Sequence, residues 1–184
     1  MPDYIDIDKT FRPRVTRYIA RLVGESEAED LAQTTMIKVE RGLAAFKGGS
    51  KLSTWIYRIA TNTALDWQKS SHGRRFGSTA PLHDPGLERV PATNRGVDAS
   101  AIRKEMKDCI RRLLDEMTEK NRVALVLSEF EERTAREIAG VLEISVENAK
   151  IRIHRSREAL RRLMTCRCHL YHDEDFNLAC DPLS

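Results

Sequence analysis

Apolar residues recur at helical spacing along almost the whole chain, and no segment shows the strict alternation of a half-buried strand. Three amphipathic helices are expected in the first seventy residues, and they end near Gly24, Gly42 and Lys69. Ser26 with Glu29 is a candidate capping box for the second helix, and Ser53 is a candidate cap for the third. A second helical set is expected over 101–116 and 119–130. The pattern therefore predicts an all-α protein.

The middle of the chain has a different composition. Residues 71–98 contain three prolines and four glycines among few apolar residues. Such a segment cannot bury enough apolar surface to offset the entropy lost on ordering, which predicts a flexible linker. The expected organisation is two small helical domains, at 1–70 and 99–164, followed by a separate tail at 165–184.

The most informative segment runs from Thr134 to Leu163. Thr134 and Glu137 have the spacing of a capping box, which would start a short helix. Residues 142–144 are then expected to form a tight turn, and Ser145 to cap a longer helix. A short helix, a tight turn and a second helix are typical of a helix-turn-helix motif. The second helix of such a motif enters the major groove of duplex DNA.

This second helix is strongly basic. Between Lys150 and Arg162 it carries six cations and a single acidic residue, Glu158. A solvated charged face is the simpler explanation of such a run, but its place after a capped helix and a turn favours DNA contact. Residues near the helix start are expected to reach base edges, and later arginines to reach phosphates. The predicted duplex contacts are Ser145, Val146, Glu147, Asn148, Lys150, Ile151, Arg152, Arg155 and Arg157.

The charge of the whole 184-residue chain, +3, understates the basicity of its body. The last twenty residues hold one arginine against four acidic residues, a net charge of −3 that leaves +6 for the rest. A charge of this size attracts polyanions at low salt. No apolar run approaches a membrane span and no signal peptide is apparent, which predicts a cytoplasmic protein without a membrane partner. No P-loop, zinc-protease or deaminase motif occurs, so no enzymatic activity is expected.

The first half carries motifs that resemble a known family. The segment Asp30-Leu31-Ala32-Gln33-Thr34-Thr35-Met36-Ile37-Lys38-Val39 resembles the DLxQxxFxxV signature of bacterial sigma factors, with Met36 in place of the usual aromatic residue. Residues 45–47 and 54–62, with Asp66 beyond them, resemble the promoter-melting helix of the same proteins. Residues 137–160 resemble their second DNA-binding region. The matches occur in the right order, without the intermediate domain of larger sigma factors. The chain is thus similar to the extracytoplasmic-function (ECF) sigma factors of the sigma-70 family.

The resemblance implies a factor that directs core RNA polymerase to promoters and helps to melt them. The second domain would read the −35 element, and it would contact the β flap of the polymerase. Contacts with the β′ clamp helices would come from the second helix, at Asp30, Leu31, Gln33, Met36 and Val39. The opened −10 element would be held by the third helix and the loop before it, at Lys51, Arg58, Asn62, Asp66 and Lys69. An anti-sigma factor is a further candidate partner.

The chemistry of these helices agrees with the roles that the resemblance implies. Asp30 and Gln33 are three residues apart, so they share one face of a helix and are available to a partner protein. The third helix mixes the aromatic residues Trp55, Tyr57 and Trp67 with cations, as proteins that bind single strands do. Trp55 itself is expected to pack in the core rather than to stack on a base.

The tail combines thiols and imidazoles. Five candidate metal ligands fall within fifteen residues, and they are Cys166, Cys168, His169, His172 and Cys180. Four of them would suffice for a tetrahedral zinc site, and the C-x-C spacing is also compatible with Cu(I). The tail resembles the cysteine-rich extension of the CorE-like sigma factors, which respond to metals such as copper. A regulatory metal site, a structural zinc, a thiol redox switch and a tail without ligands remain as alternatives.

Two functions of other classes also remain open. One is a stand-alone helix-turn-helix regulator with a structural zinc or redox site, which would bind duplex DNA without polymerase. The other is a metal-binding scaffold whose helical body contacts proteins, and which would show no DNA affinity at any salt concentration. Cys109, which stands apart from the tail in a helical pattern, is expected to pack as a small hydrophobic residue. The alternative is a fourth thiolate ligand, if the tail folds back onto that helix.

Overall fold

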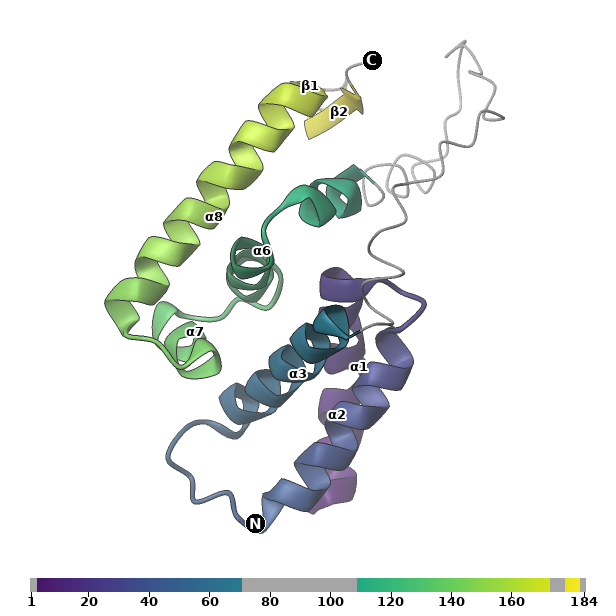
Figure 1. Cartoon of the computed structure of the whole chain (residues 1–184), viewed down its shortest axis with the longest axis vertical. Helices are drawn as coiled ribbons and strands as arrows, with labels where there is room; N and C mark the ends of the chain where they lie inside the picture. Colours follow the sequence, from purple (N-terminus) through teal and green to yellow (C-terminus); the bar gives the residue numbers. More distant parts are fainter. Residues whose placement is uncertain (1–2, 71–108, 173–177, 183–184) are drawn as a thin grey trace.

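The computed structural model describes residues 3–70, 109–172 and 178–182, so the predicted linker at 71–98 lies outside the described residues. The first domain consists of three packed helices, shown in purple to teal in Figure 1. Their bounds are α1 Tyr4–Val23, α2 Ala28–Leu43 and α3 Leu52–Lys69. The three helices predicted from apolar spacing are therefore confirmed, with ends within a residue of those expected.

The centre of this domain is a pair of tyrosines. Tyr18 on α1 is fully buried, and its hydroxyl shares a hydrogen bond of 2.7 Å with Thr61 Oγ1 on α3. The ring of Tyr18 meets that of Tyr57 edge to face, with centroids 5.1 Å apart. Burial raises the pKa of Tyr18 well above its usual value, so the group stays neutral. A buried polar group that finds its partner fixes the register of α1 against α3.

Two predicted helix caps in this domain are wrong. No side chain caps α2, which begins at Ala28, and Glu29 accepts a hydrogen bond from Thr16 Oγ1 on α1 (3.3 Å) instead of pairing with Ser26. The third helix begins at Leu52, one residue before the predicted cap Ser53. The hydroxyl of Ser53 accepts a hydrogen bond from Arg133 in the second domain (3.3 Å). In both cases a tertiary contact replaces the expected local one.

The second domain surrounds one long helix. Residues 109–116 are helical, and α6 Glu119–Leu125 continues into a π-helical turn, η1 Val126–Phe130. After it come α7 Ala135–Leu142 and α8 Val146–Arg167, and α8 packs along α6 and α7 (Figure 1). The side chains between them are apolar and buried, and include Leu114, Val123, Leu125, Leu127, Ile138, Val141, Ala149 and Ile153. The predicted helix-turn-helix is confirmed.

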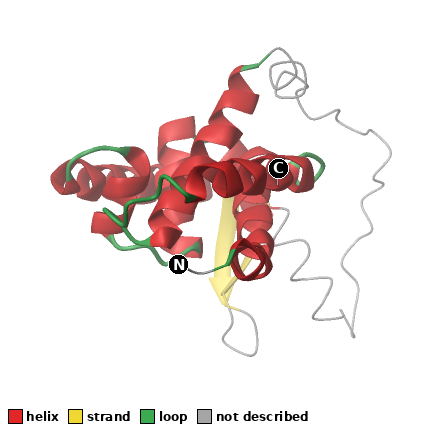
Figure 2. Cartoon of the chain, turned by 90° about the horizontal axis from the view of Figure 1, so that it is seen from below, coloured by secondary structure: helices red, strands yellow, loops and turns green. Residues whose placement is uncertain are grey.

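Strands, which the apolar pattern did not predict, occur in the tail. Strands β1 Cys168–His172 and β2 Leu178–Pro182 form an antiparallel hairpin, drawn in yellow in Figure 2. Neither five-residue segment alternates strictly between apolar and polar residues, so the apolar pattern gave no strand signal there. Among the described helices, none combines the length and apolarity that crossing a membrane requires.

Candidate nucleic-acid and partner interfaces

The helix-turn-helix is fixed by the local contacts that its sequence predicts. Thr134 Oγ1 accepts a hydrogen bond from the backbone of Glu137 (3.3 Å), and the Glu137 carboxylate accepts one from the backbone of Thr134 (3.0 Å). The helix α7 ends at Leu142, and Glu143 follows in the left-handed region with φ of 54°. Ser145 Oγ then accepts a hydrogen bond from the Asn148 backbone (3.2 Å). These caps fix where α7 and α8 begin.

One face of α8 is buried and another is open. Ala149, Ile153 and Ser156 pack inward. The opposite side exposes most of the predicted duplex contacts, which are Ser145, Glu147, Asn148, Lys150, Ile151, Arg155 and Arg157. Within the described chain, neither Lys150 nor Arg155 has a side-chain partner. Ile151 is 48% exposed, although it is a large apolar residue. The start of α8 thus presents polar, cationic and apolar groups together.

Three of the predicted duplex contacts lie elsewhere or are engaged. Val146 and Arg152 are half-buried, and Arg152 lines a cleft between the two domains. Arg157 pairs with Glu129 of η1 at 2.8 Å. The nine predicted residues therefore do not form one continuous surface, because a helix turns its successive residues to different sides.

The pKa of Glu137 is lowered to about 2. The main cause is the hydrogen bond from the Thr134 backbone, and the Lys51 ammonium, whose Nζ lies 3.0 Å from Glu137 Oε1, adds to it. Both partners favour the ionised carboxylate. The capping box is therefore charged throughout the ordinary pH range.

This carboxylate predicts an acid-sensitive start to α7. Because its pKa falls on folding from 4.5 to about 2, its contribution to stability is complete above pH 4.5 and is lost as the pH falls toward 2. Glu137→Gln keeps the hydrogen-bond acceptor but cannot be protonated. The difference in free energy of unfolding between the parent and this variant should therefore shrink across that window. Urea unfolding of both proteins at several pH values measures it, and a constant difference would contradict the assignment.

The predicted polymerase-binding residues on α2 fall into two groups. Asp30 and Gln33 are exposed, and neither has a hydrogen bond or ion pair with any described residue. The other three, Leu31, Met36 and Val39, are buried in the core of the first domain. Side chains in that position cannot touch a partner, so their prediction as contacts is corrected: they hold α2 on its domain.

Sequence reasoning missed one residue of the exposed face of α2. Ile37 is 38% exposed, and it lies four residues after Gln33 and seven after Asp30, so the three side chains share one side of the helix. The heptad-like spacing in the sequence contains this signal. An exposed apolar residue beside two polar ones is the composition of a small protein contact surface.

The predicted single-strand contacts on α3 also divide. Asn62, Asp66 and Lys69 are exposed on successive turns, and their side chains have no partner in the described part of the chain. In contrast, Lys51 and Arg58 are held by the second domain, through Glu137 and Glu143, each at 3.0 Å.

The aromatic residues of α3 are largely occupied by packing. Tyr57, one of the three aromatic residues noted on this helix, is buried and is not available to stack on a base. Trp55 is half-buried against Phe46, with ring centroids 5.0 Å apart. Trp55 therefore packs within the first domain, as expected.

A second set of contacts joins the domains through Glu131, which follows η1. The carboxylate accepts a hydrogen bond from the Tyr57 hydroxyl and pairs with Arg21 of α1 at 3.3 Å. The guanidinium of Arg133 lies over the Tyr57 ring, 4.4 Å from its centroid. Burial, and then the bond to Glu131, raise the pKa of Tyr57 to about 12. Glu131 thus links α1 and α3 to the start of the helix-turn-helix.

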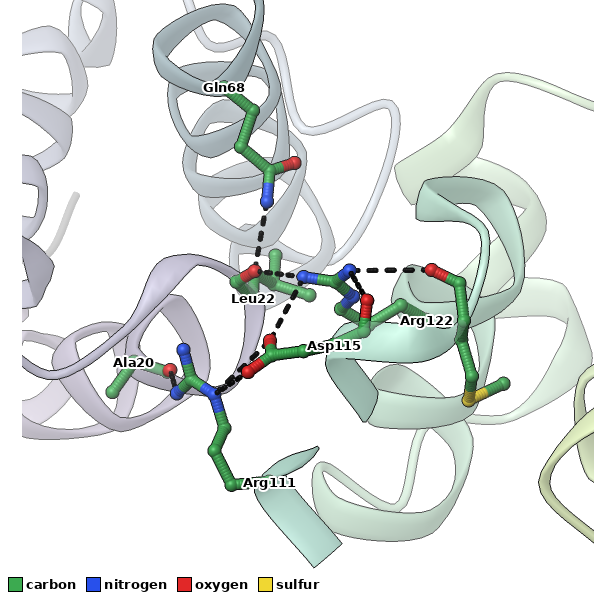
Figure 3. A network of polar contacts seen from close by, with 7 residues as sticks. Ala20, Leu22, Gln68, Arg111, Asp115 and Arg122 are labelled. Atoms are coloured by element: carbon green, nitrogen blue, oxygen red, sulfur yellow. Dashed lines mark hydrogen bonds and ion pairs between the residues drawn. The ribbon is translucent and has the colours of Figure 1, made fainter. Parts of the chain in front are cut away.

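A third set lies at the C-terminal end of α1 (Figure 3). Arg122 Nη1 donates to the Leu22 carbonyl at 2.8 Å, and Gln68 of α3 donates to the same oxygen at 2.9 Å. Arg111 donates to the carbonyl of Ala20, and Asp115 pairs with both arginines. The last carbonyls of a helix lack partners within it and carry partial negative charge. Two arginines of the second domain therefore cap a helix of the first.

Of the predicted metal ligands in the tail, only Cys166 has a side chain that the structure describes. Cys166 is exposed in the last turn of α8, while the side chains of Cys168, His169, His172 and Cys180 lie outside the described part of the structure. Among the side chains that are described, no three of the metal-binding types are grouped as a site. Cys109 is half-buried on the helical segment 109–116.

Two family models match the chain, one in each domain. Residues 8–75 match sigma-70 region 2, and residues 107–160 match sigma-70 region 4. The chain is 29% identical over 163 residues to the ECF RNA polymerase sigma factor SigW of Bacillus subtilis (86% of this chain, 87% of SigW). It is 30% identical over 161 residues to the RNA polymerase sigma factor YlaC of the same organism (87% of this chain, 91% of YlaC).

A solved structure shares the fold. It is the sigma factor RpoE in complex with the anti-sigma factor NepR, from Bartonella quintana, and it superposes with a TM-score of 0.63 at 20% identity. The superposition covers 90% of this chain and 98% of that one, so both helical domains are included.

Proposed function

The chain belongs to the ECF group of the sigma-70 family of RNA polymerase sigma factors, and from this premise we propose how its surfaces act. It binds core RNA polymerase through α2, captures the opened −10 strand on α3 and reads the −35 duplex with α8. The observation that carries the proposal is the match of both family models to the two helical domains, in the order that promoter recognition requires. The role is recognition in the cytoplasm, without catalysis by the chain itself.

The exposed face of α2 supports the assignment to polymerase. Asp30 and Gln33 offer hydrogen-bonding groups that no described side chain uses, and Ile37 adds apolar area beside them. The partner on the polymerase would be the β′ clamp helices. The β flap would contact the second domain. An anti-sigma factor is a further proposed partner, since the sigma factor of similar fold was solved bound to one.

The start of α8 supports duplex reading. Glu147 can accept from cytosine, Asn148 can pair with adenine and Lys150 can donate to guanine in the major groove. The exposed Ile151 suits the thymine methyl group, which is the apolar feature of that groove. Arg155 lies further along α8, where it can bind phosphate.

The proposed function is tested by co-elution of the purified chain with core RNA polymerase, followed by transcription of genomic fragments. A stable complex that starts transcription at defined sites, where core enzyme alone does not, supports the sigma role. A chain that binds duplex DNA alone and never joins the polymerase would be the stand-alone regulator instead.

A second proposal concerns the tail, which we infer binds a thiophilic metal such as Zn²⁺ or Cu⁺. The support is the backbone register of the hairpin, which pairs Leu170 with Cys180 and Cys168 with Pro182. Residues two apart on a strand share a face, so positions 168, 172 and 180 belong to one face of the hairpin. Cys166 lies two residues before Cys168, the first residue of the hairpin. Sulfur and imidazole ligands fit either ion.

The metal proposal predicts a loss of binding in a defined variant. Metal-free protein titrated with Zn²⁺ or Cu⁺ should bind one ion, and Cys168→Ser with Cys180→Ser should abolish stoichiometric binding. Cys109→Ser, in the helical segment 109–116 of the second domain, is the control and should still bind. Repeating the polymerase co-elution with and without metal then separates a regulatory site from a structural one. Equal metal binding by the parent chain, the double variant and the Cys109 variant would show that the tail does not supply the metal ligands.

A further inference from the structure

We infer that the free chain is closed on itself, with acidic residues of the helix-turn-helix occupying the cations that α3 needs for the −10 strand. The inference rests on the proposed function, because it takes Lys51 and Arg58 as strand-binding residues. Three independent features of the described residues carry it: ion pairs, a close helix approach and an interface with unsatisfied donors.

The ion pairs come first. Glu137 lies 3.0 Å from Lys51, and Glu143 lies 3.0 Å from Arg58, so each cation faces a carboxylate as it would face a DNA phosphate. Glu143 occupies the left-handed position that ends α7, with φ of 54°. Glycine is the usual residue there, because it adopts this conformation without strain. A glutamate at this position gives Arg58 a carboxylate partner that a glycine would not supply.

The close approach comes next. Gly140 of α7 packs beside Thr54 of α3, and a Cβ at Gly140 would stand 3.0 Å from the Thr54 methyl group. Thr54 is only 5% exposed. The absence of a side chain at position 140 therefore lets α7 lie directly on α3. A Cβ alone would require a shift of the Thr54 side chain, and a large side chain such as leucine would require α7 and α3 to move apart.

The packing of α7 against α3 also limits the access of a DNA strand to the rest of α3. Asn62 and Lys69 line a cleft whose other wall includes Val141 and Leu142 of α7 and Arg152 of α8. The surface for the −10 strand thus faces the helix-turn-helix that reads the −35 duplex. A strand that crossed α3 would meet this wall, so the two DNA-binding surfaces cannot both be fully used in the closed arrangement.

The interface is suited to opening. The ion pairs of Lys51 and Arg58 each have one partner that is largely open to solvent, Lys51 in the first and Glu143 in the second, and pairs that water screens contribute little to stability. The Nε atoms of Arg122 and Arg133, both at the domain boundary, are buried without a hydrogen-bond partner in the described chain. An unsatisfied buried donor disfavours the state that buries it. The two ion pairs that occupy Lys51 and Arg58 are therefore weak enough for a competing phosphate to displace.

The test measures binding of a fluorescent mixed-sequence single-stranded 20-mer by the full chain, without polymerase. Two variants open the chain by different means. Glu137→Gln with Glu143→Gln removes the acidic groups, and glutamine preserves the capping box. Gly140→Leu inserts a wedge without changing charge, and leucine favours the helix. Each should raise affinity roughly fivefold, as expected from the loss of weak contacts, and should increase the radius of gyration in X-ray scattering.

The matched control is Glu116→Gln with Glu158→Gln. These glutamates pair with Arg167 and Arg161 inside the second domain, so the variant changes the charge by the same amount without touching the interface. An equal gain of affinity in this control, or an unchanged Gly140→Leu protein, would overturn the inference. Transcription by the unaltered chain with core polymerase tests the sigma role separately, so failure of one does not imply failure of the other.

Discussion

Replacing Asp30 by arginine and Gln33 by alanine is expected to weaken assembly with core RNA polymerase by roughly 30- to 1,000-fold. Both side chains are exposed on α2 and lack partners among the described residues, so a polymerase surface that binds them would lose its contacts and meet a reversed charge. The buried residues Leu31, Met36 and Val39 are untouched, so the domain should keep its stability.

Competition with the labelled parent for core polymerase measures the effect, and thermal unfolding checks the fold. Asp6→Arg makes the same charge change at an exposed position of α1 and should assemble normally. If the α2 variant competes as well as the parent, this face is not the main contact.

The second large effect is expected on the recognition helix. Lys150→Glu with Arg155→Glu should lower the affinity of the assembled polymerase for a −35 duplex by about 100-fold or more, because one base contact and one phosphate contact are reversed. Neither cation is engaged by a described residue in the free chain, so both are available to DNA.

Arg161→Glu with Arg162→Glu is the control for that variant. It makes the same change of charge on the same helix, further from the end that enters the groove. Fluorescence anisotropy across a salt series distinguishes the two, since each lost phosphate contact reduces the salt slope by about 0.9. Equal losses in both variants would indicate general attraction rather than a defined docking of α8.

Local signals in the sequence predicted the second domain better than the first. The caps at Thr134 and Ser145 formed as expected, because their partners lie three residues away. Glu29 and Ser53 have equally suitable spacing, but they bind groups on α1 and in the second domain. Spacing alone cannot distinguish a helix cap from a side chain that forms a hydrogen bond with a distant element.

The candidate sites show a similar limit. The family motif on α2 mixes surface residues with core residues, and only the packing of α2 separates Asp30 from Met36. The contact between Tyr57 and Glu131 joins residues 74 positions apart, on two elements that the predicted linker separates. The spacing of apolar residues along the chain carries no information about such a distant pair, and so the docking of the domains was not predicted. The hairpin was missed because neither of its strands alternates strictly between apolar and polar residues.

The π-helical turn η1 sets the phase of everything that follows it. Glu131 donates its backbone N–H to Val126, five residues back, so one more residue is wound into this turn than an α-helix would hold. An α-helical turn over the same residues would rotate the next segment by about 100°. Glu131 would then lose its contacts with Arg21 and Tyr57, and α7 would no longer pack against α3. A single extra residue in the winding of one helix thus determines which side of the DNA-reading domain packs against the first domain.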